Sequence, residues 1–175
     1  IRKTSDFIAA SSAPCSIIAV GKKGGQFFGK RGYDVVKSFE LPASGAKLED
    51  AIQVTKLARE MFESGEADAI YVCYAKFFSA IRQVPQMIQL LPIEPEAGET
   101  AGAKLDFEFE PDSEGILNTL LPRYFQTLVW QALLEATASF FGAQMTAMTS
   151  ATDNAGKMIH GLTLKANRER QAGIT

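Results

Sequence analysis

Glycine and lysine are concentrated between Gly21 and Gly32, where the sequence reads GKKGGQFFGKRG directly after an apolar run. Free backbone N–H groups and lysine ammonium groups at the start of a helix bind phosphate. The run has neither the GxxxxGK[ST] order nor the GxGxxG spacing of nucleotide-binding loops. Phe27 and Phe28 also place large rings where a phosphate loop has small residues. Nucleotide binding at this run is one interpretation, although no complete motif supports it.

The other polar residues with catalytic potential form no known motif. His160 is the single histidine, and no serine or cysteine nucleophile motif accompanies it, so no catalytic triad is predicted. Asp153 and Asn154 could provide an acid or a metal ligand, but their helical context favours packing or hydrogen bonding against a neighbouring helix. The carboxylates between Glu94 and Glu114 lack the DxDxDG order of a calcium loop. The sequence predicts no catalytic residue, no metal ligand and no cofactor.

Cys15 and Cys73 lie 58 residues apart, and each sits within an apolar run. This spacing fits no metal-binding motif, so we expect two small buried apolar side chains. A disulfide between them is the alternative, which a cytosolic location would disfavour.

The net charge of −2 and the pI near 5.5 provide no basic footprint for nucleic acid. No apolar run approaches the roughly 18–20 residues that span a bilayer, so we expect any membrane connection to run through a partner. Eight acids and one base lie within residues 94–114, whereas four bases and one acid lie within residues 157–175. These regions indicate either two different contact surfaces or two solvated faces.

Apolar periodicity predicts an α/β domain in the first part of the chain. Residues 15–20 and 34–41 have the pattern of strands. Residues 46–64 have the pattern of an amphipathic helix, and residues 68–75 that of a strand covered on both faces. The order strand, helix, strand is typical of a βαβ unit, so we expect the second and third of these strands to pair in parallel.

Residues 83–93 have the pattern of a further strand, which Pro85 and Pro92 either shorten or place at a sheet edge. Residues 105–110 alternate strictly between apolar and acidic side chains, which predicts a half-exposed strand. We therefore assign residues 1–112 to one α/β domain.

A different pattern begins after Pro111 and continues to Thr175. Apolar or small residues recur at steps of three or four, which predicts one long coiled-coil helix over residues 113–175. The members of this stripe are Phe125, Val129, Ala132, Ala136, Phe140, Ala143, Ala147, Ala151, Ala155, Met158 and Leu162. Residues 123–175 would extend roughly 80 Å as a helix, so the helix should project beyond the domain.

The middle of this helix, residues 136–156, consists largely of Ala, Ser, Thr and Gly. These side chains bury little area, and Thr and Gly have low helix propensity, so the helix should be marginal by itself in water. The small residues do allow a second helix to approach closely. No other run in the chain is long enough to be that helix, so we expect it to come from another chain or from a missing part of this one.

Four stretches resemble the gamma subunit of the F-type ATP synthase, and the resemblance extends from about Ser16 to Thr175. They are AVGKKGGQFF at 19–28, QVPQMIQLLP at 83–92, FEPDSEGILNTLLPRY at 109–124 and SATDNAGKMIHGLTLKANRERQAGIT at 150–175. The last stretch is the most specific. Within it, Ala166 replaces a usual aromatic residue and Glu169 replaces a usual small residue, which affects local packing rather than the assignment.

The resemblance implies a Rossmann-like α/β domain followed by a C-terminal helix that forms half of an antiparallel coiled coil. In gamma subunits, a long N-terminal helix forms the other half and a first strand follows it. The family pattern also continues beyond Thr175. We therefore expect the 175 residues to be a truncated form of the subunit.

The resemblance also implies a function. A gamma subunit is the central stalk of a rotor and couples rotation of the membrane c-ring to conformational change and ATP synthesis or hydrolysis in the β subunits. Its partners are the α and β subunits, the ε subunit and the c-ring, and ATP chemistry takes place on the β subunits. The expected location is peripheral, at the cytoplasmic face of a bacterial inner membrane, or at the matrix or stroma side of the membrane if the protein is organellar. The acidic residues 94–112 are a candidate surface for ε or the c-ring.

The basic end of the helix provides the candidate interface with the β subunits. Arg170 and Gln171 match family positions that contact β-subunit loops, and Thr175 matches a nearby position. Arg168 completes the set, because a guanidinium provides a planar donor fork that suits carboxylates on a facing loop. A solvated basic helix end is the alternative.

A nucleotide-binding enzyme with a Rossmann-like fold is the second interpretation of the whole chain. It accounts for residues 15–93 and for the run from Gly21 to Gly32, but it leaves the long helical stripe unexplained.

Overall fold

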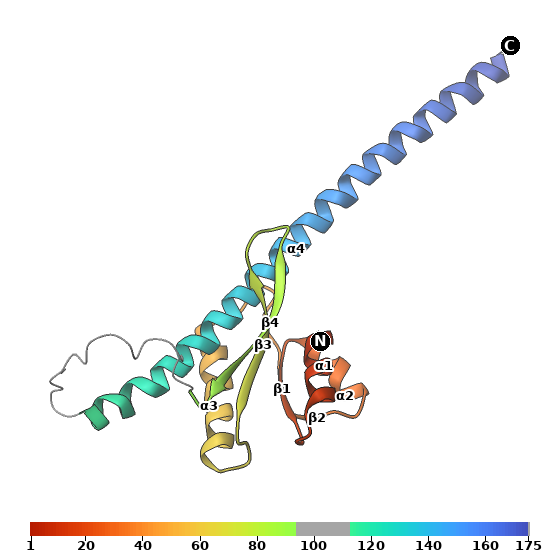
Figure 1. Ribbon diagram of the computed structural model, residues 1–175. Coiled ribbons are helices and arrows are strands. Elements are labelled where there is room, and N and C mark those ends of the chain that lie inside the picture. Colours follow the sequence, from red (N-terminus) through yellow and green to blue (C-terminus); the bar gives the residue numbers. More distant parts are fainter. Residues whose placement is uncertain (94–112, 175) are drawn as a thin grey trace, which may run out of the picture.

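The computed structural model describes residues 1–93 and 113–174, and Figure 1 shows one long helix that projects from an α/β region. Residues 1–93 are called the α/β body below. In chain order, the elements are α1 (Arg2–Ala10), β1 (Ser16–Val20), α2 (Lys22–Lys30), β2 (Asp34–Phe39), α3 (Leu48–Glu63), β3 (Ile70–Phe77), β4 (Gln83–Leu91) and α4 (Ser113–Ile174).

The first sheet is a parallel pair. β1 and β2 pair from Ser16–Asp34 to Val20–Phe39, and α2 connects them. Both strands agree with the sequence prediction. The predicted parallel pairing of residues 34–41 with residues 68–75 is wrong, because β2 and β3 belong to different two-stranded sheets. The parallel βαβ unit is instead β1–α2–β2, with its helix in the run of glycines and lysines.

α2 forms although three of its nine residues are glycines, which lower helix propensity. Packing compensates, because Phe28 is buried and its ring lies edge-on against Tyr33 at a centroid separation of 5.3 Å. A Cβ atom added at Gly25 would overlap Ser38 Oγ on β2. Glycine at this position therefore allows α2 to lie close against the sheet.

The second sheet is an antiparallel hairpin in which β3 and β4 pair from Ile70–Leu91 to Phe77–Gln83. Only residues 78–82 connect the strands, whereas a parallel crossover needs roughly a dozen residues or more. Pro85 lies in β4, in a sheet of two strands, which agrees with its predicted edge position. The strand predicted at residues 105–110 lies outside the described residues.

α1 covers part of one face of the hairpin. The sequence predicts no element for residues 1–12, but Phe7 packs against Tyr71 at a ring-centroid distance of 5.0 Å, and Lys3 Nζ donates a 3.0 Å hydrogen bond to the Pro85 carbonyl. Tyr71 is still 44% exposed, so this face of β3 is only partly covered. α1 has no buried residue of its own, and the helix depends on these contacts with the hairpin.

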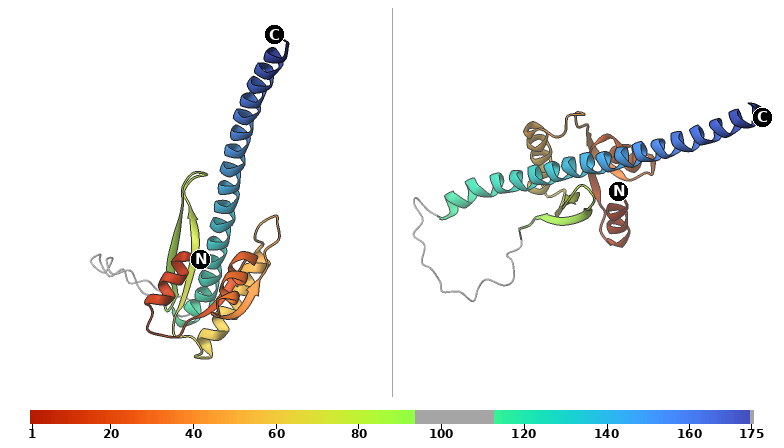
Figure 2. Two further views of the ribbon diagram at one scale, coloured as in Figure 1. Left: turned by 90° about the vertical axis from the view of Figure 1, so that its right-hand side faces the viewer. Right: turned by 90° about the horizontal axis from the view of Figure 1, so that it is seen from above.

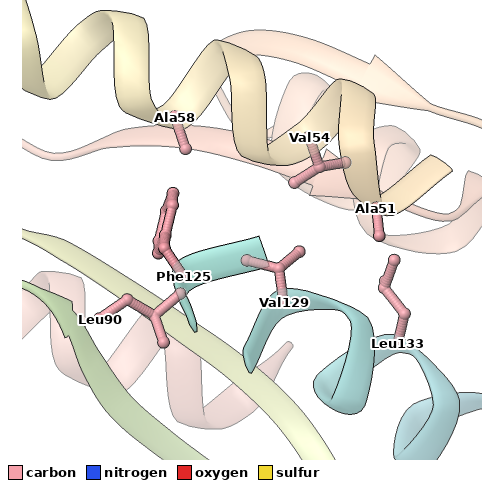
Figure 3. Close-up of a cluster of buried hydrophobic side chains, with 7 residues drawn as sticks. All are labelled: Ala51, Val54, Ala58, Leu90, Phe125, Val129 and Leu133. Atoms are coloured by element: carbon pink, nitrogen blue, oxygen red, sulfur yellow. The ribbon is translucent and has the colours of Figure 1, made fainter. Parts of the chain in front are cut away.

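The hydrophobic core lies between α3, the hairpin and the first half of α4. Figure 3 shows the cluster: Ala51, Val54 and Ala58 of α3, Leu90 of β4, and Phe125, Val129 and Leu133 of α4. The sequence pattern of residues 46–64 would place the apolar residues Leu48 and Ile52 on the buried face as well, but they are 46% and 44% exposed. The buried face of α3 is therefore rotated towards Ala51, Val54 and Ala58, because α4 packs on that side.

α4 is a single helix of 62 residues, as the apolar stripe predicts. Its only proline, Pro122, is the tenth residue of the helix, so it removes one backbone hydrogen bond, the one to the Asn118 carbonyl. The helix crosses the α/β body and then extends far beyond it (Figure 2). Every residue from Ala143 to Ile174 is exposed. Within the described residues, no helix has the length and apolar character that crossing a bilayer would need.

Candidate functional site: the projecting helix

The predicted stripe on α4 is divided into a covered part and an open part. Phe125, Val129 and Ala132 are buried, with exposed fractions of 2%, 5% and 3%, and Ala136 is half-buried. The remaining members are all exposed: Phe140, Ala143, Ala147, Ala151, Ala155, Met158 and Leu162. The same helix face thus forms core within the α/β body and faces solvent above it.

The open part of the stripe exposes large apolar side chains. Phe140, Met158 and Leu162 have exposed fractions of 62%, 68% and 61%. Complete burial of one such side chain is worth about 1.5–3 kcal/mol. A contiguous apolar surface that continues a buried helix face indicates an interaction surface.

In the exposed part of α4, threonine hydroxyl groups form hydrogen bonds within the helix itself. Thr152, which lies beside the stripe residue Ala155, donates from Oγ1 to the Met148 carbonyl at 3.0 Å. A hydroxyl that is already bonded within its helix can enter an apolar contact at lower cost. This observation favours the prediction that a second helix packs closely on this segment.

The basic end of α4 presents its predicted contact residues on different sides. Arg168, Arg170 and Gln171 are all exposed in the last turns of the helix. Because a residue advances by about 100°, Arg168 and Gln171 lie roughly 60° apart, whereas Arg170 lies roughly 160° from Arg168. The first two therefore share a face, and Arg170 points to another. Thr175 lies outside the described residues.

One ionisable pair lies where α4 meets the hairpin. Burial, and to a smaller degree the negative charge of Glu135, raises the pKa of Tyr74 above its ordinary value of 10.0. Glu135 Oε1 accepts a 3.0 Å hydrogen bond from Gln131 Nε2. Its other oxygen, Oε2, is buried and has no hydrogen-bond partner among the described residues. The sequence analysis did not select either residue, because only the packing of α4 on β3 brings them together.

The run from Gly21 to Gly32 does not form a phosphate loop. Gly21, with φ of 105°, precedes α2, and the helix occupies most of the run. The guanidinium of Arg31 lies 4.0 Å from the centroid of the Phe27 ring, and Phe28 is buried. Helix packing thus accounts for Gly25 and for the aromatic residues of the run, which provides no phosphate loop for the nucleotide-binding interpretation.

The remaining sequence candidates are dispersed. His160, Asp153 and Asn154 are all exposed on α4. Cys15 and Cys73 are free, so the disulfide alternative is wrong, and both are partly exposed rather than buried as predicted. Within residues 1–93 and 113–174, no group of three or more His, Cys, Asp or Glu side chains could hold a metal.

Two open grooves accompany the α/β body. The larger, of about 500 Å³, lies between α1 and the hairpin and is lined by Lys3, Asp6, Phe7, Tyr71, Met87 and Gln89. The smaller, of about 260 Å³, lies between α3 and α4 near Pro122. Neither groove gathers a set of side chains with an evident chemical role.

The structure thus consists of an α/β body and one long helix that is exposed along its length beyond the body (Figure 2). A family model described as ATP synthase matches residues 1–175. The chain therefore belongs to the ATP synthase family. Its match to gamma chains confirms the resemblance that the four sequence stretches indicate.

Two relatives show the extent of this match. The ATP synthase gamma chain of Brevibacillus brevis is 49% identical over 160 residues, which cover 91% of this chain and 55% of the relative. The ATP synthase gamma chain of Moorella thermoacetica is 44% identical over 179 residues, which cover 100% of this chain and 61% of the relative. The chain thus spans a little more than half the length of these curated relatives.

Solved structures show the same fold. The central stalk and c-ring of Tetrahymena thermophila mitochondrial ATP synthase contain a chain with a TM-score of 0.63 and 21% identity, covering 86% of this chain and 66% of that one. The rotor of Euglena gracilis mitochondrial ATP synthase contains one with a TM-score of 0.68 and 15% identity, covering 99% and 68%. At these identities, the comparison establishes the α/β region and its long helix.

Proposed function

We propose that these residues form part of the central-stalk gamma subunit of an F-type ATP synthase. The subunit couples rotation of a membrane c-ring to conformational change and ATP synthesis or hydrolysis in the β subunits. The observation that carries this proposal is the open stripe on α4, which continues a buried helix face for many turns beyond the α/β body. A shaft that packs against a second helix and passes through a ring of partners requires such a surface.

The second helix of the shaft comes from outside these 175 residues. It packs on the stripe from Phe140 to Leu162, where small residues allow close approach and Met158 and Leu162 provide apolar area. Two packed helices resist twisting better than one, so the pair can transmit torque. The chain spans 55% and 61% of two gamma-chain relatives, which leaves ample length for such a helix in the full subunit.

The chain acts mechanically, and ATP chemistry takes place on the β subunits. An asymmetric shaft favours a different conformation in each β subunit that it faces, and rotation changes which subunit is in which state. The α/β body contacts the ε subunit and the c-ring, with residues 94–112 as a candidate part of that surface. The subunit is peripheral to the membrane at its cytoplasmic face and reaches the membrane through these partners. Residues 1–112 serve as the foot domain and residues 113–175 as the shaft.

The basic end of α4 contacts the β subunits through Arg168, Arg170, Gln171 and Thr175. Arginine forks bind carboxylates on a facing loop, and such contacts can break and form again as the shaft turns. Because Arg168 and Arg170 lie on different sides of the helix, they can contact different subunits of a surrounding ring at the same time.

The test replaces Arg170 and Gln171 together by Ala in the full-length subunit. Assembly with α and β subunits and the rate of ATP hydrolysis are then measured. We expect a lower rate, because a β-subunit contact that changes during rotation is lost. Lys157→Ala is the matched control, since it removes another exposed positive charge from the same helix. Unchanged assembly and rate in the double variant would remove these residues from the interface.

A further inference from the structure

α4 is held from two opposite sides where it leaves the α/β body. On one side, Ser139 Oγ donates a 2.9 Å hydrogen bond to the Ala75 carbonyl, and Thr146 Oγ1 donates a 3.0 Å hydrogen bond to the Ala80 carbonyl. On the other side, the Ala46 N–H donates to Thr137 Oγ1 at 3.5 Å. Residues 137 and 139 point roughly 160° apart on a helix, so the two sets of contacts face each other across α4.

A glycine allows close contact on each side. A Cβ atom added at Gly142 would lie 3.1 Å from Phe77 Cε2 and 3.2 Å from Ala80 Cα. The tip of the hairpin therefore lies almost directly on the backbone of α4. On the opposite side, a Cβ atom added at Gly45 would lie 2.7 Å from Thr137 Cγ2. Gly45 also has a φ of +103°, which residues with a side chain rarely adopt.

Within the described residues, the hydrogen bonds from α4 side chains to the α/β body end at this level. From residue 147 to residue 174 every helix residue is exposed, and Thr146 is the final residue whose side chain bonds to the body. Below this level α4 contributes apolar side chains such as Val129 to the core. A helix that turns about its own axis must break directional hydrogen bonds and close glycine contacts on both of its sides. Apolar packing on one face resists this rotation less, because apolar contacts are not directional.

We propose that this collar, formed by residues 75–80 and 45–46 around residues 137–146, fixes α4 against rotation relative to the α/β body. The inference rests on the proposed function, because it makes the collar the place where torque passes between the shaft and the body. Gly142 and Thr146 are then positioning residues for coupling.

The test uses two variants of the full-length subunit in the complete enzyme. Gly142→Val pushes the hairpin tip away from α4, and Thr146→Val removes the bond to Ala80 with little change of volume. We expect the protons pumped per ATP hydrolysed in membrane vesicles to fall by roughly threefold or more. ATP hydrolysis by the detached head should stay near its usual rate, because the far end of the shaft is unchanged.

Thr149→Val is the matched control for Thr146→Val. Both threonines bond to the carbonyl four residues earlier, at 3.1 Å for Thr146 and 3.0 Å for Thr149, but only Thr146 also bonds to the body. The control should keep full coupling. Equal coupling in Thr146→Val, Gly142→Val and the unmodified enzyme would overturn the collar.

A second measurement separates the collar from the proposed function. Spin labels at Ile81 on the hairpin tip and Met148 on α4, both well exposed, report their mutual distance in the isolated full-length subunit. One narrow distance distribution is expected for the unmodified protein and a broad one for Gly142→Val. An unchanged distribution would refute the collar, whereas failure of the unmodified subunit to assemble with α and β subunits would refute the proposed function alone.

Discussion

Ser139 on α4 donates a 2.9 Å hydrogen bond to the backbone carbonyl of Ala75 on β3. Ser139 is only 4% exposed, so this bond lies within the protein. In the described part of the chain β3 pairs with β4 alone, and this bond adds a contact from an α4 side chain to a carbonyl of the strand. The relationship joins the shaft helix to the sheet by a specific polar contact as well as by apolar packing.

Replacement of Ser139 by Ala should leave the Ala75 carbonyl without this donor. Loss of a buried hydrogen bond with one group left unsatisfied costs about 1–3 kcal/mol. We expect the free energy of unfolding of the full-length subunit to fall by that amount in urea denaturation. Ser150→Ala, at an exposed position on the same helix, should change it little. Equal stability of the two variants would show that the bond contributes nothing.

Two adjacent leucines test the position of the core. Leu133 is 8% exposed and belongs to the core cluster, whereas Leu134 is 45% exposed. Leu133→Ala should lower the free energy of unfolding by about 2–5 kcal/mol, because it leaves a cavity between α3 and α4. Leu134→Ala should lower it by only about 0.5 kcal/mol. Calorimetry of the isolated full-length subunit measures both, and a larger effect at Leu134 would contradict the register of α4.

The raised pKa of Tyr74 predicts that the free energy of unfolding falls at alkaline pH. Its pKa is raised in the folded protein by burial and, to a smaller degree, by Glu135, so the folded state keeps the phenol proton more strongly than the unfolded state. The free energy of unfolding should therefore be unaffected by this group below about pH 10 and should fall as pH rises through the raised pKa. Denaturation as a function of pH should show this fall in the unmodified protein and lose it in Tyr74→Phe.

Glu135→Gln provides the matched control for the electrostatic part of this effect. It removes the negative charge but keeps the shape of the side chain, so the ultraviolet titration of Tyr74 should move to lower pH while remaining above the ordinary value. A titration that moves to higher pH would contradict the placement of Glu135 beside Tyr74.

The open stripe predicts which face of α4 accepts a second helix. Ala151→Glu places a charge on the stripe, whereas Thr149→Glu places one on roughly the opposite side of the helix. We expect Ala151→Glu to lower the melting temperature of the full-length subunit, followed by circular dichroism, and Thr149→Glu to leave it nearly unchanged. A lower melting temperature for Thr149→Glu than for Ala151→Glu would place the second helix on the face opposite the stripe and would contradict this prediction.

The sequence predicts the long helix and the strands well because their signals are local. The stripe from Phe125 to Leu162 has one period throughout, and the structure contains one helix at that place. The four strands of the described residues begin and end close to their predicted bounds. These patterns depend on neighbouring residues alone, so a single sequence is sufficient to find them.

Pairing and packing could not be predicted in the same way. α2 contains three glycines, and only the burial of Phe28 against the sheet makes a helix of this segment. α1 depends on a contact between Phe7 and Tyr71, which are far apart in the sequence. The wrong prediction that β2 pairs with β3 has the same cause. The sequence does not predict α2, and α2 is the helix that connects the parallel strands β1 and β2.

In the candidate site, too, some residues could be selected from the sequence and others only from the folded structure. The tip residues Arg170 and Gln171 were selected by a family resemblance and Arg168 by the donor geometry of its guanidinium, whereas the collar around Gly142 was not selected at all. Gly142 belongs to no recognisable sequence motif. Its role depends on Phe77 and Ala80, which only the folded hairpin brings to the backbone of α4.

Single-molecule rotation tests the central claim most directly. The full-length subunit, with Cys15 and Cys73 replaced by Ser, carries one new cysteine at the exposed residue Lys30 on α2, to which a bead is attached. The α and β subunits of the assembled head are fixed to a surface and supplied with ATP. We predict that the bead rotates continuously in one direction while ATP is hydrolysed. A bead that stays still on a head that hydrolyses ATP would contradict the role of this chain as a rotor.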